Sequence, residues 1–337
     1  MRILILYINS IAHFLVDAIS VTTLFSGGAA GETLTAAVVI YNTLAFSTQC
    51  IVGLLVDKFK HYLHFDIAAM LLVILGFALP LPYFARVVTV ALGNSFFHVA
   101  AGTMTLTKSR GRAWQLGVFV APGAFGVTLA SCFPRFGWWL CAALLICAAA
   151  AIYLWPRTPQ TLELRYEDSE KTKFPVAPVG LLTLAVAVRA VGGTAVSFPW
   201  KTGAGMAFLM TAFVFAGKTL GGFVCDRLGA AKTAWLSIPI AAVCIAFFPA
   251  YAVPSLLGQF LLNLTMPVTL WLLYRAMPDE PAFAFGLAAS ALWPGTIAGM
   301  LFQLTGPALW ICVIVSFLFG LFAILYSTKT LHIERKE

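Results

Sequence analysis

Apolar stretches, separated by short polar or proline- and glycine-containing turns, repeat along almost the whole chain. Roughly 20 apolar residues cross the hydrocarbon core of a bilayer as one α-helix, whereas strands of a membrane barrel would alternate over about ten residues. The pattern therefore predicts an all-α polytopic membrane protein. Its twelve transmembrane helices are expected at residues 3–25, 32–56, 63–81, 84–107, 113–132, 136–155, 177–197, 203–225, 231–250, 254–275, 282–302 and 305–327.

The composition supports this interpretation. The chain is 61% hydrophobic and only 10% charged, whereas soluble globular domains carry roughly 25% charged residues. The first apolar stretch resembles a signal peptide, but it is longer than usual and contains His13 and Asp17. We therefore interpret it as the first membrane helix.

The longest polar segment follows the sixth predicted helix and divides the chain into two halves. We expect two pseudo-symmetric six-helix bundles, residues 1–155 and residues 177–337, joined by a linker at residues 156–176. An even number of helices places both termini on one side of the membrane. That side carries 16 of the 21 Lys and Arg residues, so the positive-inside rule predicts that it is cytoplasmic.

This asymmetry explains the net charge of +8 as topology rather than as a nucleic-acid surface. The seven cysteines form no C-x-x-C pair and no metal-ligand spacing. We therefore expect no metal and no cofactor, and we predict a multi-pass plasma-membrane protein of a prokaryote.

Two charged turns lie half a chain apart. Gly53 is followed by Asp57-Lys58, and Gly222 is followed by Asp226-Arg227. The two aspartates are 169 residues apart in a chain of 337, which indicates an internal duplication. We predict that these residues hold a cytoplasmic gate, with each carboxylate accepting hydrogen bonds from a helix N-terminus of the other half.

Two further segments repeat at similar distances. The fourth and tenth predicted helices each carry two polar residues one turn apart, and the fifth and eleventh each carry a Pro-Gly pair that is expected to bend the helix and let neighbours approach. These residues are Asn94 and His98 against Gln259 and Asn263, and Pro122, Gly123 and Gly126 against Pro294 and Gly295.

Over its whole length the chain resembles the major facilitator superfamily, whose loop motif is similar to both charged turns. The segment from Gly117 through Pro122 to Gly126 resembles a degraded antiporter motif of that superfamily. A closer resemblance is to fosmidomycin-resistance-type transporters. They share a His and an Asp in the first helix, a Phe-His in the fourth and an Arg in the seventh, matched here by His13, Asp17, Phe97, His98 and Arg189, although Val99 replaces the proline that follows Phe-His.

Ionisable side chains inside a bilayer are costly and need a reason to be there. His13 and Asp17 lie one turn apart on one helix face, and we interpret them as the proton-coupling pair; a local hydrogen bond that only fills the bundle is the alternative. Asp17 is the one acid expected deep in a span. Lys218 is interpreted as structural, with its long stem reaching toward the cytoplasm.

The remaining intramembrane polar residues are predicted to contact a substrate in a central cavity, although amides also hold helices together. Arg189 has two open roles, an anion site and an ion pair with Asp17, of which we favour the ion pair. The predicted substrate-binding residues are Asn94, His98, Arg189, Gln259 and Asn263.

The predicted function is secondary transport rather than enzymatic catalysis. No G-x-x-x-x-G-K-[ST] motif is present, so a proton gradient is the expected energy source. The preferred hypothesis is efflux of a small organic compound, with anions among the candidates, by proton antiport in a monomer whose partners are substrate, protons and lipid. Uptake by proton symport is the alternative. A membrane enzyme acting on a lipid-linked substrate is a third reading, disfavoured because no paired acids lie on one helix face.

Overall fold

The computed structural model describes residues 2–109, 111–154, 174–302 and 304–333, so most of the expected linker lies outside the described residues. A 3₁₀ turn at Ser26–Gly28 and a π-helical turn at Thr43–Ser47 accompany the α-helices. The α-helices are α1 (Arg2–Leu24), α2 (Gly31–Asn42), α3 (Gln49–Phe59), α4 (Tyr62–Ala78), α5 (Tyr83–Lys108), α6 (Trp114–Val120), α7 (Pro122–Cys132), α8 (Gly137–Leu154), α9 (Val176–Thr194), α10 (Gly203–Leu228), α11 (Ala230–Phe247), α12 (Ala252–Ala276), α13 (Pro281–Leu301) and α14 (Gly306–Thr330).

The predicted fold class is confirmed. Among the described residues, 11 helical stretches are long and apolar enough to cross a bilayer, and α4 adds a shorter apolar helix that matches the predicted span 63–81. Two predicted spans are interrupted rather than continuous. The second consists of α2, the π-helical turn and α3, and the fifth consists of α6 and α7, which meet at Ala121 and Pro122.

These interruptions have local causes. Pro122 lacks a backbone N–H, so the helix restarts there with proline in its first turn. At the π-helical turn, the carbonyl of Phe46 accepts a hydrogen bond from Ser290 Oγ of α13 (3.0 Å), as widened helical turns allow. Pro294 does not interrupt its helix as Pro122 does. Instead, α13 continues through it.

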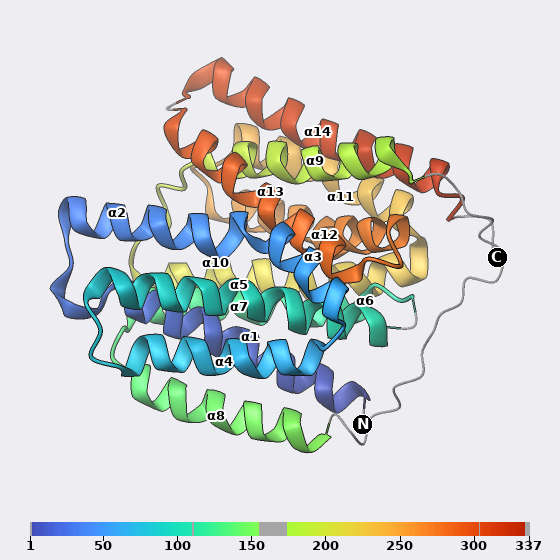
Figure 1. Ribbon diagram of the computed structural model, residues 1–337. Helices are drawn as coiled ribbons and strands as arrows, with labels where there is room; N and C mark the ends of the chain where they lie inside the picture. The colour runs from blue at the N-terminus through green and yellow to red at the C-terminus, as the bar shows by residue number, and fades with distance from the viewer. Residues whose placement is uncertain (1, 110, 155–173, 303, 334–337) are drawn as a thin grey trace.

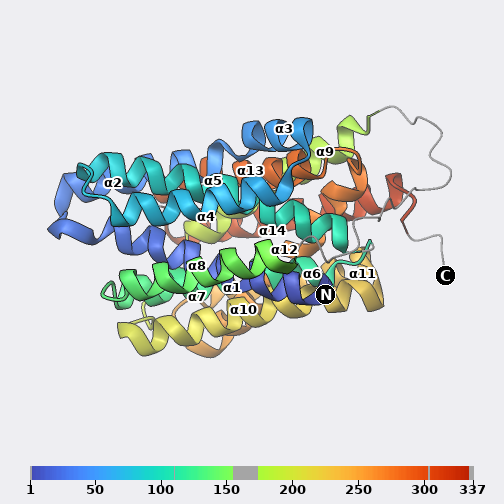
Figure 2. The ribbon, with the colours of Figure 1, turned by 60° about the horizontal axis from the view of Figure 1, so that its bottom comes forward.

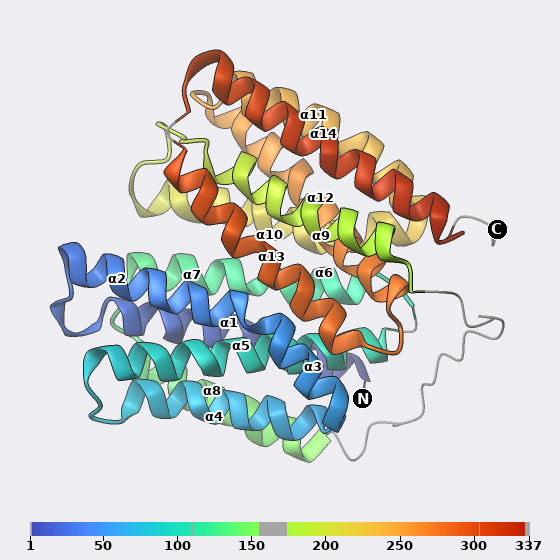
Figure 3. The same ribbon diagram turned by 45° about the horizontal axis from the view of Figure 1, so that its top comes forward.

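The helices lie along a common long axis (Figures 1 and 2). Those up to α8 gather on one side and α9 to α14 on the other, and α1 begins at the same end of the molecule where α14 finishes. We call this the terminal end and the opposite one the distal end. Figure 3 shows α3 crossing α13 near the terminal end, whereas α2 and α13 diverge toward the distal end.

Glycines in the repeated Pro-Gly segments bring the helices close together. A Cβ atom on Gly126 of α7 would overlap the carbonyl of Phe14 in α1, and one on Gly295 of α13 would overlap the carbonyl of Ala187 in α9. Small residues at such crossings let backbones approach within the bilayer. The same contact is therefore made once in each half of the chain.

Candidate functional site

A cavity of about 460 Å³ lies between the two groups of helices. One wall, from the first half, carries His13 and Asp17 of α1 and His98 of α5. The opposite wall is formed by α9, α10, α12 and α13. Its polar residues are Arg189, Lys218, Gln259 and Asn263.

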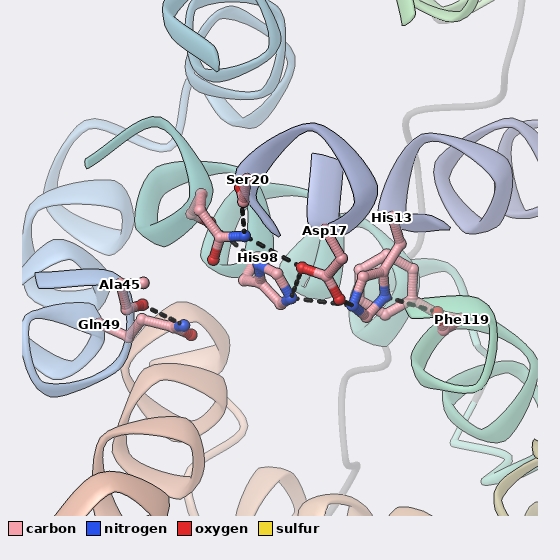
Figure 4. Close-up of polar contacts among 8 residues, drawn as sticks. His13, Asp17, Ser20, Ala45, Gln49, His98 and Phe119 are labelled. Atoms are coloured by element: carbon pink, nitrogen blue, oxygen red, sulfur yellow. Dashed lines mark hydrogen bonds and ion pairs between the residues drawn. The ribbon is translucent and has the colours of Figure 1, made fainter. Parts of the chain in front are cut away.

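Asp17 is the centre of a polar cluster on the first wall (Figure 4). Its Oδ2 lies 3.3 Å from His13 Nε2, and its Oδ1 lies 3.7 Å from His98 Nε2. Asn94 Nδ2 donates to Asp17 Oδ1 at 3.0 Å and approaches Ser20 Oγ at 3.4 Å. The carboxylate therefore has polar partners from two different helices.

The two histidines of the cluster also contact each other. His13 Nε2 and His98 Nε2 are 2.8 Å apart. On the far side of each ring, His13 Nδ1 lies 2.8 Å from the Phe119 carbonyl oxygen, and His98 Nδ1 lies 2.9 Å from the Asn94 carbonyl oxygen. Each ring is thus held at both nitrogens.

The local sequence explains how the cluster assembles. A spacing of four residues puts His13 and Asp17 on one face of α1, and the same spacing aligns Asn94 and His98 on α5. Because α6 ends at Val120, carbonyls of its last turn lack helical donors, and His13 uses that of Phe119. Gly123 completes the arrangement, since a Cβ atom there would overlap both Asp17 Oδ2 and His13 Nε2.

The opposite wall is rich in cations. Arg189 donates from Nη1 to Thr265 Oγ1 at 3.0 Å. The ion pair between Arg189 and Asp17 that we favoured is wrong for this conformation, because no carboxylate among the described residues lies within 4.0 Å of Arg189 or Lys218. Lys218, which we interpreted as a structural lysine reaching toward the cytoplasm, lines the cavity.

The remaining predicted substrate contacts divide into two groups. Gln259 and Asn263 line the cavity, and Asn263 Nδ2 donates to the backbone carbonyl oxygen of Gln259 at 2.7 Å. His98 lines it too, while it also bonds to His13. Asn94 is fully buried behind the cluster and is absent from the cavity wall. Its side chain donates to Asp17 instead, so in this conformation it does not border the cavity where a substrate contact was predicted.

Two features escaped the sequence analysis. Gln49 of α3 lines the cavity, and its Oε1 has no hydrogen-bond partner among the described residues, while its Nε2 donates to Ala45 (Figure 4). Asp66 of α4 is fully buried, with neither oxygen hydrogen-bonded in the part of the chain that the structure describes. It does not line the cavity, and its place near a predicted helix end hid its burial.

Two equivalent contacts join the halves of the chain at the terminal end. Asp57 accepts from the N–H groups of Ala282 (3.0 Å) and Phe283 (2.7 Å), at the beginning of α13. Asp226 accepts from Ala113 (2.7 Å) and Trp114 (3.1 Å), at the beginning of α6. The predicted capping of a helix N-terminus in the other half is therefore present at both sites.

The glycines of the two charged turns have a steric role in these contacts. A Cβ atom on Gly53 would overlap the backbone of Ala282 and Phe283, and one on Gly222 would overlap the backbone of Ala113 and Trp114. Each glycine thus lets the capped helix approach one turn from the aspartate. The adjacent bases, Lys58 and Arg227, are exposed at the terminal end.

The atoms of His13, Asp17 and His98 are close enough to be tested as metal ligands, since all lie within 4.8 Å of one another. Two imidazole nitrogens on one tetrahedral zinc ion, with bonds of 2.0–2.1 Å, stand about 3.3 Å apart. The 2.8 Å between the two Nε2 atoms is shorter and matches a hydrogen bond. The geometry therefore fits a proton better than a metal ion.

No protein-family model matches the chain, and no curated protein matches it by sequence. Among solved structures, the chain is similar to the major facilitator superfamily transporter FucP in its outward conformation, with a TM-score of 0.73 and 14% identity over 96% of this chain and 98% of that one. It is also similar to the E. coli fucose:proton symporter FucP in a variant form, with a TM-score of 0.67 and 12% identity over 96% of both chains. The protein therefore has the fold of the major facilitator superfamily transporters.

Proposed function

We propose that this protein is a proton-coupled secondary transporter of a small organic anion. The observation that carries the proposal is the division of charge across one cavity. Arg189 and Lys218 line one wall without a carboxylate partner among the described residues, and the opposite wall carries a cluster that can bind a proton. An anion is the ligand that this arrangement favours, because a guanidinium and an ammonium at the edge of an apolar cavity gain most from a negative partner.

Alternating access would supply the transport cycle. In this proposal, residues 1–155 and residues 177–337 move as two units around the cavity, connected by residues 156–176. The contacts of Asp57 and Asp226 support it, since they join the two halves at the terminal end. Residues Lys58, Arg227, Gly53 and Gly222 belong to the same gate.

The charge layout favours symport. A proton bound at the cluster adds a positive charge to the cavity, so it strengthens the binding of an anion, and the two ligands would travel together. One structural neighbour, the E. coli fucose:proton symporter, works in this mode.

Export by proton antiport, which the sequence favoured, is the second candidate. It is supported by the antiporter-like segment around Pro122, whose Gly123 lies directly against His13 and Asp17. An outward-moving monoanion exchanged for an inward-moving proton would also use the membrane potential twice, at about 2.3 kcal/mol per charge per 100 mV.

We also propose membership of the fosmidomycin-resistance-type subgroup. Support comes from the convergence of its shared residues His13, Asp17, His98 and Arg189 on one cavity. The excess of Lys and Arg in the segments predicted on the side of the two termini supports a cytoplasmic location of both termini in a prokaryotic inner membrane. A monomer is proposed because one chain supplies both walls of the cavity.

The class of substrate can be tested by thermal stability. The purified full chain would be melted with a panel of sodium carboxylates, sulfonates and phosphates, and with matched neutral alcohols and amides. An anion at 100 times its Kd stabilises the protein by about 2.7 kcal/mol. We expect the effect from anions alone, lost in Arg189→Gln and Lys218→Gln and kept in the exposed control Lys201→Gln. Stabilisation by neutral compounds only would contradict the anion site.

A further inference from the structure

We infer that His13 and His98 share one proton between their Nε2 atoms, and that this pair carries the coupling proton while Asp17 remains its ionised counter-ion. The inference deepens the proposed function, on which its transport role rests. It differs from the sequence hypothesis in two respects. The proton lies on the histidines rather than on the carboxyl group, and His98 becomes a partner of His13 rather than a substrate ligand.

The argument begins at the two Nδ1 atoms. Each lies at hydrogen-bond distance from a backbone carbonyl oxygen, Phe119 for His13 and Asn94 for His98. A carbonyl oxygen only accepts, so both Nδ1 atoms must carry the hydrogen. A neutral imidazole has a single N–H group. In each neutral ring, the single N–H group is therefore at Nδ1, and Nε2 carries a lone pair.

The two Nε2 atoms are nevertheless only 2.8 Å apart. Two lone pairs at this distance repel each other, whereas one N–H group pointing at one lone pair makes an ordinary hydrogen bond. The pair therefore needs one proton more than two neutral imidazoles have. When that proton binds to one Nε2, it turns that ring into an imidazolium whose N–H donates to the other ring.

Asp17 neutralises the resulting charge. Its carboxylate lies 3.3 Å from one Nε2 and 3.7 Å from the other, so it stabilises the proton on either ring. If the proton were bound to Asp17 instead, no hydrogen would lie between the two Nε2 atoms and their lone pairs would repel each other. Asn94 donates to the same carboxylate at 3.0 Å, which favours its ionised form.

Other charged or titratable groups border the cluster. Lys218 of α10 acts on His98 and Asp17, and Arg189 of α9 acts on Lys218. Tyr41 of α2 lies beside Asp17 and Ser20. The positive charge of Lys218 opposes the shared proton, and a bound anion would offset that charge. The pair thus couples proton and anion binding within one cavity.

Loss of the proton has a structural consequence. The two lone pairs then face each other, and the contact between α1 and α5 through the rings becomes repulsive. Release of the proton therefore favours separation of the histidines, which links the protonation state to helix movement.

The test is nitrogen NMR of the full chain in lipid nanodiscs, labelled with ¹⁵N-histidine. The five histidines are assigned by single substitutions. We expect protonated Nδ1 atoms in both rings and one strongly deshielded proton that correlates with both Nε2 atoms. It should vanish in His13→Gln and in His98→Gln, with the remaining ring returning to a neutral tautomer. His61→Gln and His64→Gln are matched controls, because these rings are only 5.5 Å apart and lie at a helix end outside the cavity.

Three results would overturn the inference. The first is a pair of Nε2 resonances that titrate independently, and the second is a proton that resides on Asp17. The third is a stoichiometric metal ion, removed by EDTA and absent from His98→Gln. The NMR measurement does not depend on transport activity. A shared proton found in a protein that shows no transport would therefore support the inference and contradict only the proposed function.

Discussion

Asp57 and Asp226 make the same contact from opposite halves of the molecule, each accepting two backbone N–H groups at the beginning of a helix from the other half. The positive end of a helix dipole strengthens these hydrogen bonds. Both contacts lie on the terminal side of the cavity and must break if that end opens. We therefore propose that they act as a latch of the conformation described here.

We predict that Asp226→Asn weakens this latch by roughly 1–2 kcal/mol, which corresponds to about a five- to thirtyfold shift in population. The neutral amide loses the charge but keeps one acceptor. Cys225, buried beside Asp226, reports the opening, so its alkylation by a permeant maleimide should accelerate. Asp279→Asn, an exposed acid in the loop before α13, is the control. Unchanged labelling of Cys225 would exclude a latch at Asp226.

Asp17→Asn should abolish proton-driven accumulation but permit exchange of substrate down its gradient. The reason is that the histidine pair loses its counter-ion, so the proton is bound too weakly to drive the cycle. The measurement is flux of a radiolabelled anion, identified by the melting panel, in proteoliposomes with and without a pH gradient. Uphill transport at the wild-type rate would show that Asp17 is not needed.

Arg189→Lys should weaken anion binding about tenfold or more while changing the melting temperature little. A lysine keeps the charge but loses the planar fork that holds a carboxylate or phosphate with two hydrogen bonds. Anion titration followed by melting measures both effects. Thr265→Val, which removes the hydroxyl partner of Arg189, separates loss of orientation from loss of the fork.

Arg189 also allows a test of whether it forms an ion pair with Asp17. Because Arg189 and Asp17 are not paired in this conformation, melting of Asp17→Asn, Arg189→Gln and the double variant should give effects that add within about 0.5 kcal/mol. Strong coupling between the two substitutions would mean that they pair in the dominant conformation of the apo protein.

Gly123→Ala should disrupt the polar cluster, since its methyl group has no space beside Asp17 and His13. We expect loss of the shared-proton resonance and of proton-driven flux. Gly180→Ala is the matched control in a helix, because nothing lies within 4 Å of a Cβ atom there, and alanine favours a helix by up to about 1 kcal/mol. A normal cluster spectrum in Gly123→Ala would refute this close packing.

The membrane potential distinguishes symport from antiport. Entry of a monoanion with one proton moves no net charge, whereas export of the anion in exchange for a proton moves two charges inward. An inside-negative potential set by potassium and valinomycin should therefore leave symport unchanged and accelerate antiport strongly. The control is the same imposed potential in liposomes that lack the protein.

The sequence by itself determined the fold class, the spans and the repeated helix-capping contacts of Asp57 and Asp226. An apolar stretch of about 20 residues crosses a bilayer as an α-helix, because each of its backbone polar groups must then be hydrogen-bonded within the same segment. The paired motifs of Asp57 and Asp226 predicted these contacts, since a glycine and an acid one turn apart suit the capping of a nearby helix. His13 and Asp17 were identified as a pair because a four-residue spacing fixes them on one helix face.

Only the tertiary structure decided which helices supply the other partners. The meeting of His13 with His98, and the choice of Thr265 over Asp17 as the partner of Arg189, depend on side chains of distant helices. For the same reason, the sequence did not predict that Lys218 and Gln49 line the cavity, or that Asn94 lies outside its wall. Periodicity gives the face of each helix but not the rotation and depth at which two faces meet. Those follow from packing at close contacts such as Gly123, which no linear pattern specifies.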